Sequence, residues 1–372
     1  MASTSSPTPN RFPILSRPFL AGALASFFGL LLFCEALLRV AVPAGLCYRF
    51  LGLPADMTSL AEVRDRLEAG FSGKPGGEKL IVLGDSVLGA SALMERRLPE
   101  ARQKTLAAFL KEPLAQRGYQ SLSLGSDGLL LADIEGLSTE FLSRPPGRIL
   151  LLLNFRMFSK DFAEGPKALS RNFLLPDLPE DIQNRLAPAK APEAEALLSD
   201  RLYAWMCDHW FLFRETQAAK SFWYYPSQKD FFQRQLEKVV PKSEADMDIL
   251  EAARKQKIAP YYQAYLWEER ALPLACLKRV LDQWVEHHIP VQVVLTPQNA
   301  RFLGNDLDKP SFKRNREILA QFLKAYSWQG VSYQDWAGRF SPDFFLDHCH
   351  LTPEGNRKYA GDLGQLLGKA QP

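Results

Sequence analysis

The stretch Leu80-Ile81-Val82-Leu83-Gly84-Asp85-Ser86 decides the fold. Its four apolar residues, two of them β-branched, predict a buried central strand, and the apolar residues from Val87 to Leu93 predict a helix directly after it. Ser86 is therefore expected on a strand-to-helix turn, where Gly84 allows a sharp bend and Asp85 can cap the helix or brace the loop. N–H groups at the start of that helix would lie near Ser86, where an oxyanion forms during acyl transfer.

A second motif, Asp347-His348-Cys349-His350, can supply the base that a serine nucleophile needs. Asp347 and His350 are three residues apart, so the carboxylate can reach the imidazole, fix its tautomer and stabilise the imidazolium. His350 can then accept the Ser86 proton, and a helix running to about Leu367 would hold this loop against the domain. The other histidines outside the motif lie in a region predicted to be helical: His209, His287 and His288.

The same four-residue motif also allows a metal site, because imidazole, thiolate and carboxylate are all competent ligands. Adjacent residues in one loop rarely satisfy a tetrahedral site, and the sequence contains no second Cys/His cluster to complete it. We therefore expect no metal and no organic cofactor, and expect His348 to line the cleft or pack locally.

The remaining pattern alternates between strands and helices. Apolar runs at Leu150 to Leu153 and Val291 to Leu295 predict strands, Phe312 to Tyr326 predicts a helix, and Gly330 to Tyr333 predicts a short strand. This βαβ alternation favours a parallel sheet.

These motifs resemble the SGNH/GDSL-type hydrolases, over roughly residues 79–155 and 289–367. The resemblance implies an α/β, flavodoxin-like (SGNH) fold, a three-layer parallel sheet with a helical insertion and an N-terminal transmembrane helix. It also implies that Gly128 donates an oxyanion N–H. The third block of the family reads Gly-x-Asn-Asp, whereas this chain has Asn154-Phe155-Arg156-Met157 after the strand. Arg156 stands where the family has its oxyanion-hole Asn, and Asn154 substitutes for it if the register slips by two. An Arg can stabilise an oxyanion or bind a phosphate or carboxylate on the substrate.

The altered third block resembles one branch of the family, the membrane-anchored D-alanyl transfer protein and the envelope polysaccharide O-acetylation proteins. The Pro-x-Asn turn of that branch corresponds to Thr296-Pro297-Gln298-Asn299 here. The resemblance implies a serine esterase or acyltransferase that acts on acetyl or similar O-acyl esters of a cell-envelope glycan through a Ser86 acyl-enzyme. The alternative is a non-catalytic accessory protein that partners an integral membrane O-acyltransferase.

The N-terminal region predicts a membrane anchor. Residues 19–42 are apolar apart from Glu35 and Arg39 and would form a helix of roughly 36 Å, long enough to span a bilayer. The alternatives are a cleaved signal peptide and a buried helix. We expect a single-pass protein with residues 1–18 as a cytoplasmic tail and the catalytic domain outside, periplasmic or at the cell surface. Residues 43–78 would form a stalk with a helix opening at the capping box Ser59-x-x-Glu62.

The catalytic domain is expected in two parts, residues 79–156 and 289–372, separated by a helical insertion at residues 157–288. The insertion is rich in aromatic residues. They predict either a small helical core or an exposed patch that meets lipid, an acyl chain or a membrane partner. Those residues are Trp205, Trp210, Phe211, Phe213, Phe222, Trp223, Tyr224, Tyr225, Phe231 and Phe232.

Composition and net charge narrow the classes of protein that this sequence fits. The chain has 372 residues, 47% of them hydrophobic and 23% charged, which is ample for a sizeable core. Its net charge is only +3, with basic residues dispersed among acidic ones, so nucleic acid is not an expected partner. The five cysteines show no paired spacing, and a disulfide is not indicated.

Overall fold

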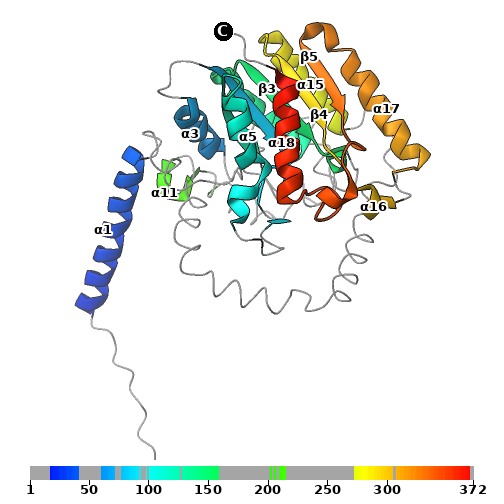
Figure 1. The fold of residues 1–372 in the computed structure, drawn as a ribbon. Coiled ribbons are helices and arrows are strands. Elements are labelled where there is room, and N and C mark those ends of the chain that lie inside the picture. Colours follow the sequence, from blue (N-terminus) through cyan, green and yellow to red (C-terminus); the bar gives the residue numbers. More distant parts are fainter. Residues whose placement is uncertain are drawn as a thin grey trace, which may run out of the picture.

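Five parallel strands form one sheet in the order β2-β1-β3-β4-β5 in a computed structural model (Figure 1). The structure describes residues 17–41, 60–71, 77–90, 92–93, 98, 100–125, 128–158, 202, 205–206, 209–214, 272–304 and 307–368. The strands are β1 Glu78–Gly84, β2 Tyr119–Gly125, β3 Arg148–Leu153, β4 Val291–Leu295 and β5 Val331–Asp335. The architecture is therefore α/β with an all-parallel sheet.

Helices cover both faces of the sheet, which is why the central strands are continuous apolar runs. In β1, Ile81 and Leu83 point into one core cluster and Leu80 and Val82 into the other. The first cluster contains side chains of α3 Leu60–Phe71, α6 Leu131–Ser143, α15 Leu272–Glu286 and α17 Pro310–Lys324. The second contains side chains of α5 Leu106–Ala115 and α18 Pro353–Leu367.

The register brings the carboxyl ends of the strands to one edge. Gly84 at the end of β1 pairs with Gly125, and Leu153 at the end of β3 pairs with Leu295. Polar segments that follow different strands therefore meet at this edge, which is where parallel α/β sheets bind their ligands.

The predicted strands at 80–83, 150–153 and 291–295 are confirmed as parts of β1, β3 and β4, and the last predicted strand corresponds to β5. The predicted helix at 312–326 is α17, which begins two residues earlier because Pro310 suits the first turn of a helix. The helix predicted to reach Leu367 is α18.

The helix predicted over Val87 to Leu93 is wrong. The described residues form a turn at 86–88, and helical backbone is found only at 92–93. Tight i to i+3 hydrogen bonds join Leu88 N to Asp85 O and Gly89 N to Ser86 O, both at 3.1 Å. Gly89 is a poor helix former, so the turn does not propagate. The next long helix is α5, which begins at Leu106.

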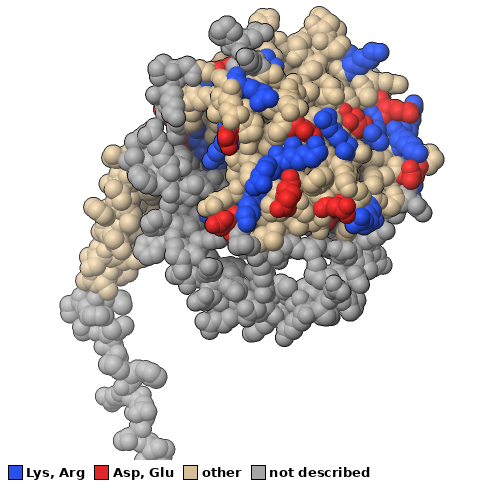
Figure 2. Space-filling model, in the orientation of Figure 1, with Lys and Arg blue, Asp and Glu red and all other residues tan. Residues whose placement is uncertain are grey.

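The N-terminal helix α1, Arg17–Ala41, stands outside the sheet and its covering helices (Figure 1). Residues Ala21–Val40 are long and apolar enough to cross a membrane, and large side chains such as Phe33 and Val40 are 65% and 71% exposed. Figure 2 shows charged side chains of both signs over the face of the domain and none along the visible length of this helix. The helix predicted after Ser59 corresponds to α3, but its Val63 and Leu67 are buried in the first core cluster, so it packs on the sheet and does not form a stalk.

Most of the predicted insertion at 157–288 lies outside the described residues, including its aromatic residues from Phe222 to Phe232. Within it the structure describes α11, Phe211–Arg214, a few residues before it, and α15. Trp205 is exposed, and Trp210, Phe211 and Phe213 are half-buried. Trp205, Trp210, Phe211 and Phe213 therefore do not form a closed core, whereas Trp284 of α15 is buried in the first core cluster.

Candidate active site

Ser86, His350 and Asp347 form a hydrogen-bonded chain at the carboxyl edge of the sheet. Ser86 Oγ lies 2.8 Å from His350 Nε2, and His350 Nδ1 lies 2.7 Å from Asp347 Oδ2. Because an ionised carboxylate only accepts hydrogen bonds, Nδ1 carries the proton and Nε2 is free to accept the Ser86 hydroxyl proton. The structure thus brings together, in the geometry of a Ser-His-Asp triad, three residues selected from two distant motifs.

The loop that carries Asp347 and His350 is closed by its own backbone. Asp347 Oδ1 accepts hydrogen bonds from the backbone N–H groups of Cys349 at 3.0 Å and His350 at 2.8 Å. Leu346 N donates to His350 O at 2.7 Å, and α18 begins directly after the loop. Both oxygens of the carboxylate are therefore held, which leaves Oδ2 aimed at the imidazole.

Asn299 fastens this loop to the end of β4. Its Nδ2 donates to Asp347 O and its backbone N donates to His348 O, both at 2.8 Å. Its Oδ1 caps the short helix α16, Ala300–Leu303, by accepting from Arg301 N. The Pro-x-Asn resemblance singled out this turn, but its role as a support for the Asp347 loop depends on a contact that the sequence does not reveal.

Asp85 and Arg156 form a buried ion pair beside Ser86. Asp85 is fully buried, and its Oδ1 accepts from Val87 N at 3.1 Å, so it braces the turn. Arg156 Nη2 donates to Asp85 Oδ2 at 3.0 Å and to Ser86 Oγ at 3.1 Å. The guanidinium therefore contacts the hydroxyl oxygen itself, in a position to stabilise negative charge on it.

Asn154 is the second residue, beside Arg156, that was expected as a possible oxyanion donor. Leu83 pairs with Leu151, so the residues three positions later, Ser86 and Asn154, leave the sheet side by side. Asn154 is fully buried, and its Nδ2 has no hydrogen-bond partner among the described residues. Its Oδ1 accepts from Arg156 N at 3.3 Å, which fixes the amide orientation. A buried amide donor of this kind suits an oxyanion that forms only during reaction.

Gly128 lies in the loop between β2 and α6, in a left-handed conformation with φ of 69°. The closer approach to the nucleophile turn is made by Gly125, where a Cβ would lie 3.0 Å from Gly84 O and 3.3 Å from Asp85 O. Gly125 therefore allows the end of β2 to pass close to the turn that carries Ser86. The sequence pattern alone did not show that Gly125 has this packing role, and it assigned an oxyanion N–H to Gly128 instead.

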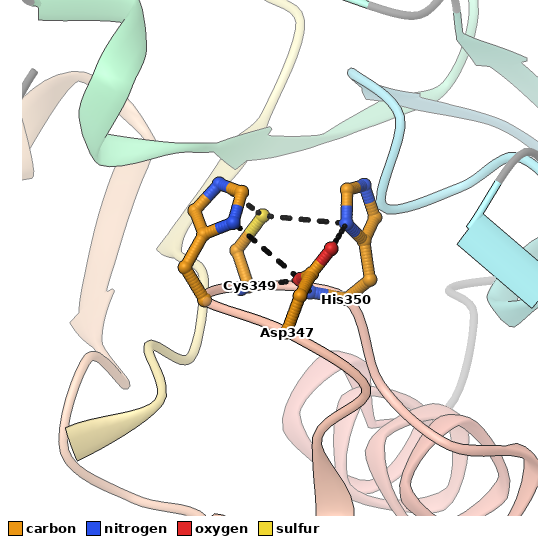
Figure 3. A group of neighbouring side chains, drawn as sticks. Asp347, Cys349 and His350 are labelled. Carbon is orange, nitrogen blue, oxygen red and sulfur yellow. Dashed lines mark hydrogen bonds and ion pairs between the residues drawn. The ribbon is translucent and has the colours of Figure 1, made fainter. Parts of the chain in front are cut away.

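Cys349 and His348 form a cluster with Asp347 and His350, of which Figure 3 labels Asp347, Cys349 and His350. Cys349 Sγ lies 3.2 Å from His348 Nε2 and 3.9 Å from His350 Nδ1. Burial favours the neutral thiol, but the two imidazoles outweigh it and lower the pKa of Cys349 to about 6. The potential ligand atoms of these three residues and Asp347 lie within 4.8 Å of one another. Two of the four already belong to the triad, so a bound metal would displace the triad hydrogen bonds.

The charges in the triad support one another. Burial opposes ionisation of Asp347, but His350 and the backbone donors outweigh it and hold the pKa of this carboxyl well below its usual range. Burial likewise opposes the imidazolium of His350, whereas Cys349 and Asp347 raise its pKa well above the ordinary value. His350 is therefore a strong base whose protonated form is stabilised in place.

Comparison with known families finds no family model that matches this chain, and comparison with curated proteins finds no match either. Functional conclusions therefore depend on the chain's own residues. Chemically, the arrangement offers an oxygen nucleophile, a base with its orienting acid, and two nitrogen donors from Asn154 and Arg156.

Proposed function

We propose that the protein is a membrane-anchored serine esterase or acyltransferase of the SGNH type. The observation that carries the proposal is the continuous hydrogen-bonded path from Ser86 Oγ through His350 to Asp347, at 2.8 and 2.7 Å. Three such residues, brought together from opposite ends of the chain, match the requirements of covalent acyl chemistry.

In the proposed reaction, Ser86 Oγ attacks the carbonyl carbon of an ester while His350 Nε2 takes the hydroxyl proton. The oxyanion is stabilised by Asn154 Nδ2, while Arg156 stabilises charge on Oγ. Nε2 then gives the proton to the departing alkoxide, leaving an acyl group on Ser86. Water or an acceptor hydroxyl then attacks this ester and gives its proton to Nε2. As the bond between the acyl carbon and Ser86 Oγ breaks, Nε2 passes that proton to Oγ, which releases the acid or the new ester and restores the Ser86 hydroxyl.

The SGNH assignment draws support from the topology as well as from the motifs. The strand order 2-1-3-4-5 is that of flavodoxin-like folds. The nucleophile follows the first strand of the sheet, and the acid and base precede the last helix. This chain order of Ser, Asp and His follows the family pattern that the motifs resemble.

We propose an envelope glycan carrying acetyl or similar small O-acyl groups as the substrate, with the domain outside the cytoplasm. The apolar helix α1 supports a single-pass anchor, and the small net charge of +3 gives no support to a nucleic-acid partner. An integral membrane O-acyltransferase is the partner expected if the acyl group is transferred rather than hydrolysed.

A fluorophosphonate probe tests the proposal directly, because it forms a covalent adduct with an activated serine. We expect labelling of the wild-type protein at Ser86, none of Ser86→Ala, and strong loss in His350→Ala. Ser121, on β2 and away from the triad, provides a matched control, since Ser121→Ala should label like the wild type. A folded wild-type protein that is not labelled would instead support the accessory role without chemistry.

A further inference from the structure

Glu35 is an acidic residue in the apolar helix α1, and its carboxylate accepts hydrogen bonds from a distant part of the chain. The residue is only 6% exposed. Its Oε1 accepts from Phe211 N at 3.1 Å and its Oε2 from Leu212 N at 2.9 Å, 176 and 177 residues away along the chain. Ionisable residues in spanning helices are costly unless such partners are supplied, so this contact marks a specific docking point.

Arg39, one turn later, completes the same contact. Its Nε lies 2.8 Å from Glu35 Oε1, and its Nη2 donates to His209 O at 2.8 Å. The guanidinium carbon also lies 5.5 Å from the centre of the Phe211 ring, within cation–π range. Glu35 and Arg39 are therefore both engaged by residues 209–212 of the insertion.

The position of this contact along α1 places it near a membrane surface. The helix has 25 residues, roughly 37 Å, against about 30 Å for the hydrocarbon core. Glu35 precedes the end of the helix at Ala41 by six residues, or about 9 Å. With α1 centred across the bilayer, about 3–4 Å of helix would project on each side, so Glu35 and its partners at residues 211–212 would lie about 5 Å inside the hydrocarbon edge, just below the headgroups.

The side chains around this contact have the character expected at that depth. Leu202 and Trp205 are 54% and 52% exposed. Trp205 stacks on His209 with ring centres 4.6 Å apart, and Trp210 packs edge-on against Phe213 at 6.4 Å. Tryptophan concentrates at membrane interfaces because one part of the ring is apolar and its N–H is polar.

We propose that residue 202, residues 205–206 and residues 209–214 form an interfacial segment that binds the lipid headgroup region and is clamped to the anchor by Glu35 and Arg39. The inference rests on the spanning role of α1 in the proposed function, but not on the chemistry at Ser86.

Tryptophan quenching by brominated lipid tests the contact in the full-length protein in nanodiscs of brominated phosphatidylcholine. We expect Trp205→Phe to remove a large part of the quenched emission. The control is Trp328→Phe, since Trp328 is 81% exposed on the catalytic domain, and it should leave the quenched part unchanged. Equal effects of the two substitutions, or no quenching at all, would overturn the proposal.

Hydrogen exchange tests the clamp separately from the lipid. In Glu35→Leu the amides of Phe211 and Leu212 lose their acceptor, so their exchange should accelerate about tenfold or more. Glu68→Leu, in the exposed part of α3, is the control and should leave both amides protected. Unchanged exchange in Glu35→Leu would refute the clamp. Ser86→Ala should abolish probe labelling without altering quenching or exchange, which separates failure of the catalytic proposal from failure of this one.

Discussion

Replacing Arg156 with methionine is expected to slow acylation of Ser86 by about 10- to 150-fold. Its Nη2 donates both to Ser86 Oγ at 3.1 Å and to Asp85 Oδ2 at 3.0 Å. A hydrogen bond from a charged donor contributes about 1.5–3 kcal/mol, which converts to that range of rates if it acts on the oxygen in the transition state. Methionine is chosen because its unbranched apolar side chain fills the space without supplying a donor.

The same substitution leaves Asp85 buried without its guanidinium partner. Asp85 is fully buried and the Arg156 side chain is 15% exposed, so the pair is nearly sealed from water. Breaking such a pair from one side lowers the free energy of unfolding by about 3 kcal/mol. Adding Asp85→Asn removes the stranded charge, so the double variant should recover much of that stability.

The assay is the second-order rate of fluorophosphonate labelling, measured with the unfolding midpoint in denaturant for each variant. We expect the double variant to be more stable than Arg156→Met yet still slow to label. Labelling of the double variant at the wild-type rate would show that Arg156 acts only by neutralising Asp85. Wild-type labelling by Arg156→Met itself would refute a contribution of Arg156 to the reaction altogether.

Three further predictions concern the loop that carries Asp347 and His350 and the residues that contact it. Asn299→Ala removes the donor to Asp347 O and the cap of the following helix, so the free energy of unfolding should fall by about 1–2 kcal/mol and labelling should slow. Asn299→Asp keeps the cap but lacks the amide donor. Equal labelling rates of the wild type and Asn299→Asp would rule out a role for the amide. The rate should rise with pH as His350 loses its proton, with a midpoint above the ordinary pKa of 6.5, and Cys349→Ser should move that midpoint lower because Cys349 raises the pKa of His350. An unmoved midpoint would contradict that coupling. Zn²⁺ should inhibit labelling by binding Cys349 and His348 behind the triad, and Cys349→Ser should require at least about tenfold more Zn²⁺; equal sensitivity would place the inhibitory ion elsewhere.

Much of the sheet could be predicted because its central strands are buried on both faces. A buried strand such as 80–83 or 291–295 reads as an apolar run regardless of what packs against it, and helices α17 and α18 show clear boundaries at proline residues. Ser86, Asp347 and His350 could be selected because two short motifs carry the residue types that a triad requires. Their contact across the sheet edge followed from a parallel fold.

Other features depend on contacts that no local pattern reveals. The turn after Ser86 was expected to be helical because its residues are apolar, whereas the Asp85 carboxylate captures Val87 N and the chain turns tightly. Asn154 and Arg156 could not be told apart as partners of Ser86, because the chain leaves its regular strand there and side-chain direction no longer alternates. The sequence shows Glu35 as a charged residue within the apolar run 19–42, but its partners lie 176 and 177 residues away.

The hydrogen bond between Ser86 and His350 has a consequence during synthesis of the chain. The two residues are 264 positions apart, and α18 must pack on α5 before the base is held in place. At synthesis rates of about 5–20 residues per second, the nucleophile turn leaves the ribosome roughly 13–50 seconds before its base. If the proposed function holds, a nascent chain that has already inserted its N-terminal helix would carry an inert serine, and acyl chemistry would begin only after the last helix has been released. Prematurely terminated chains would remain in the membrane without activity.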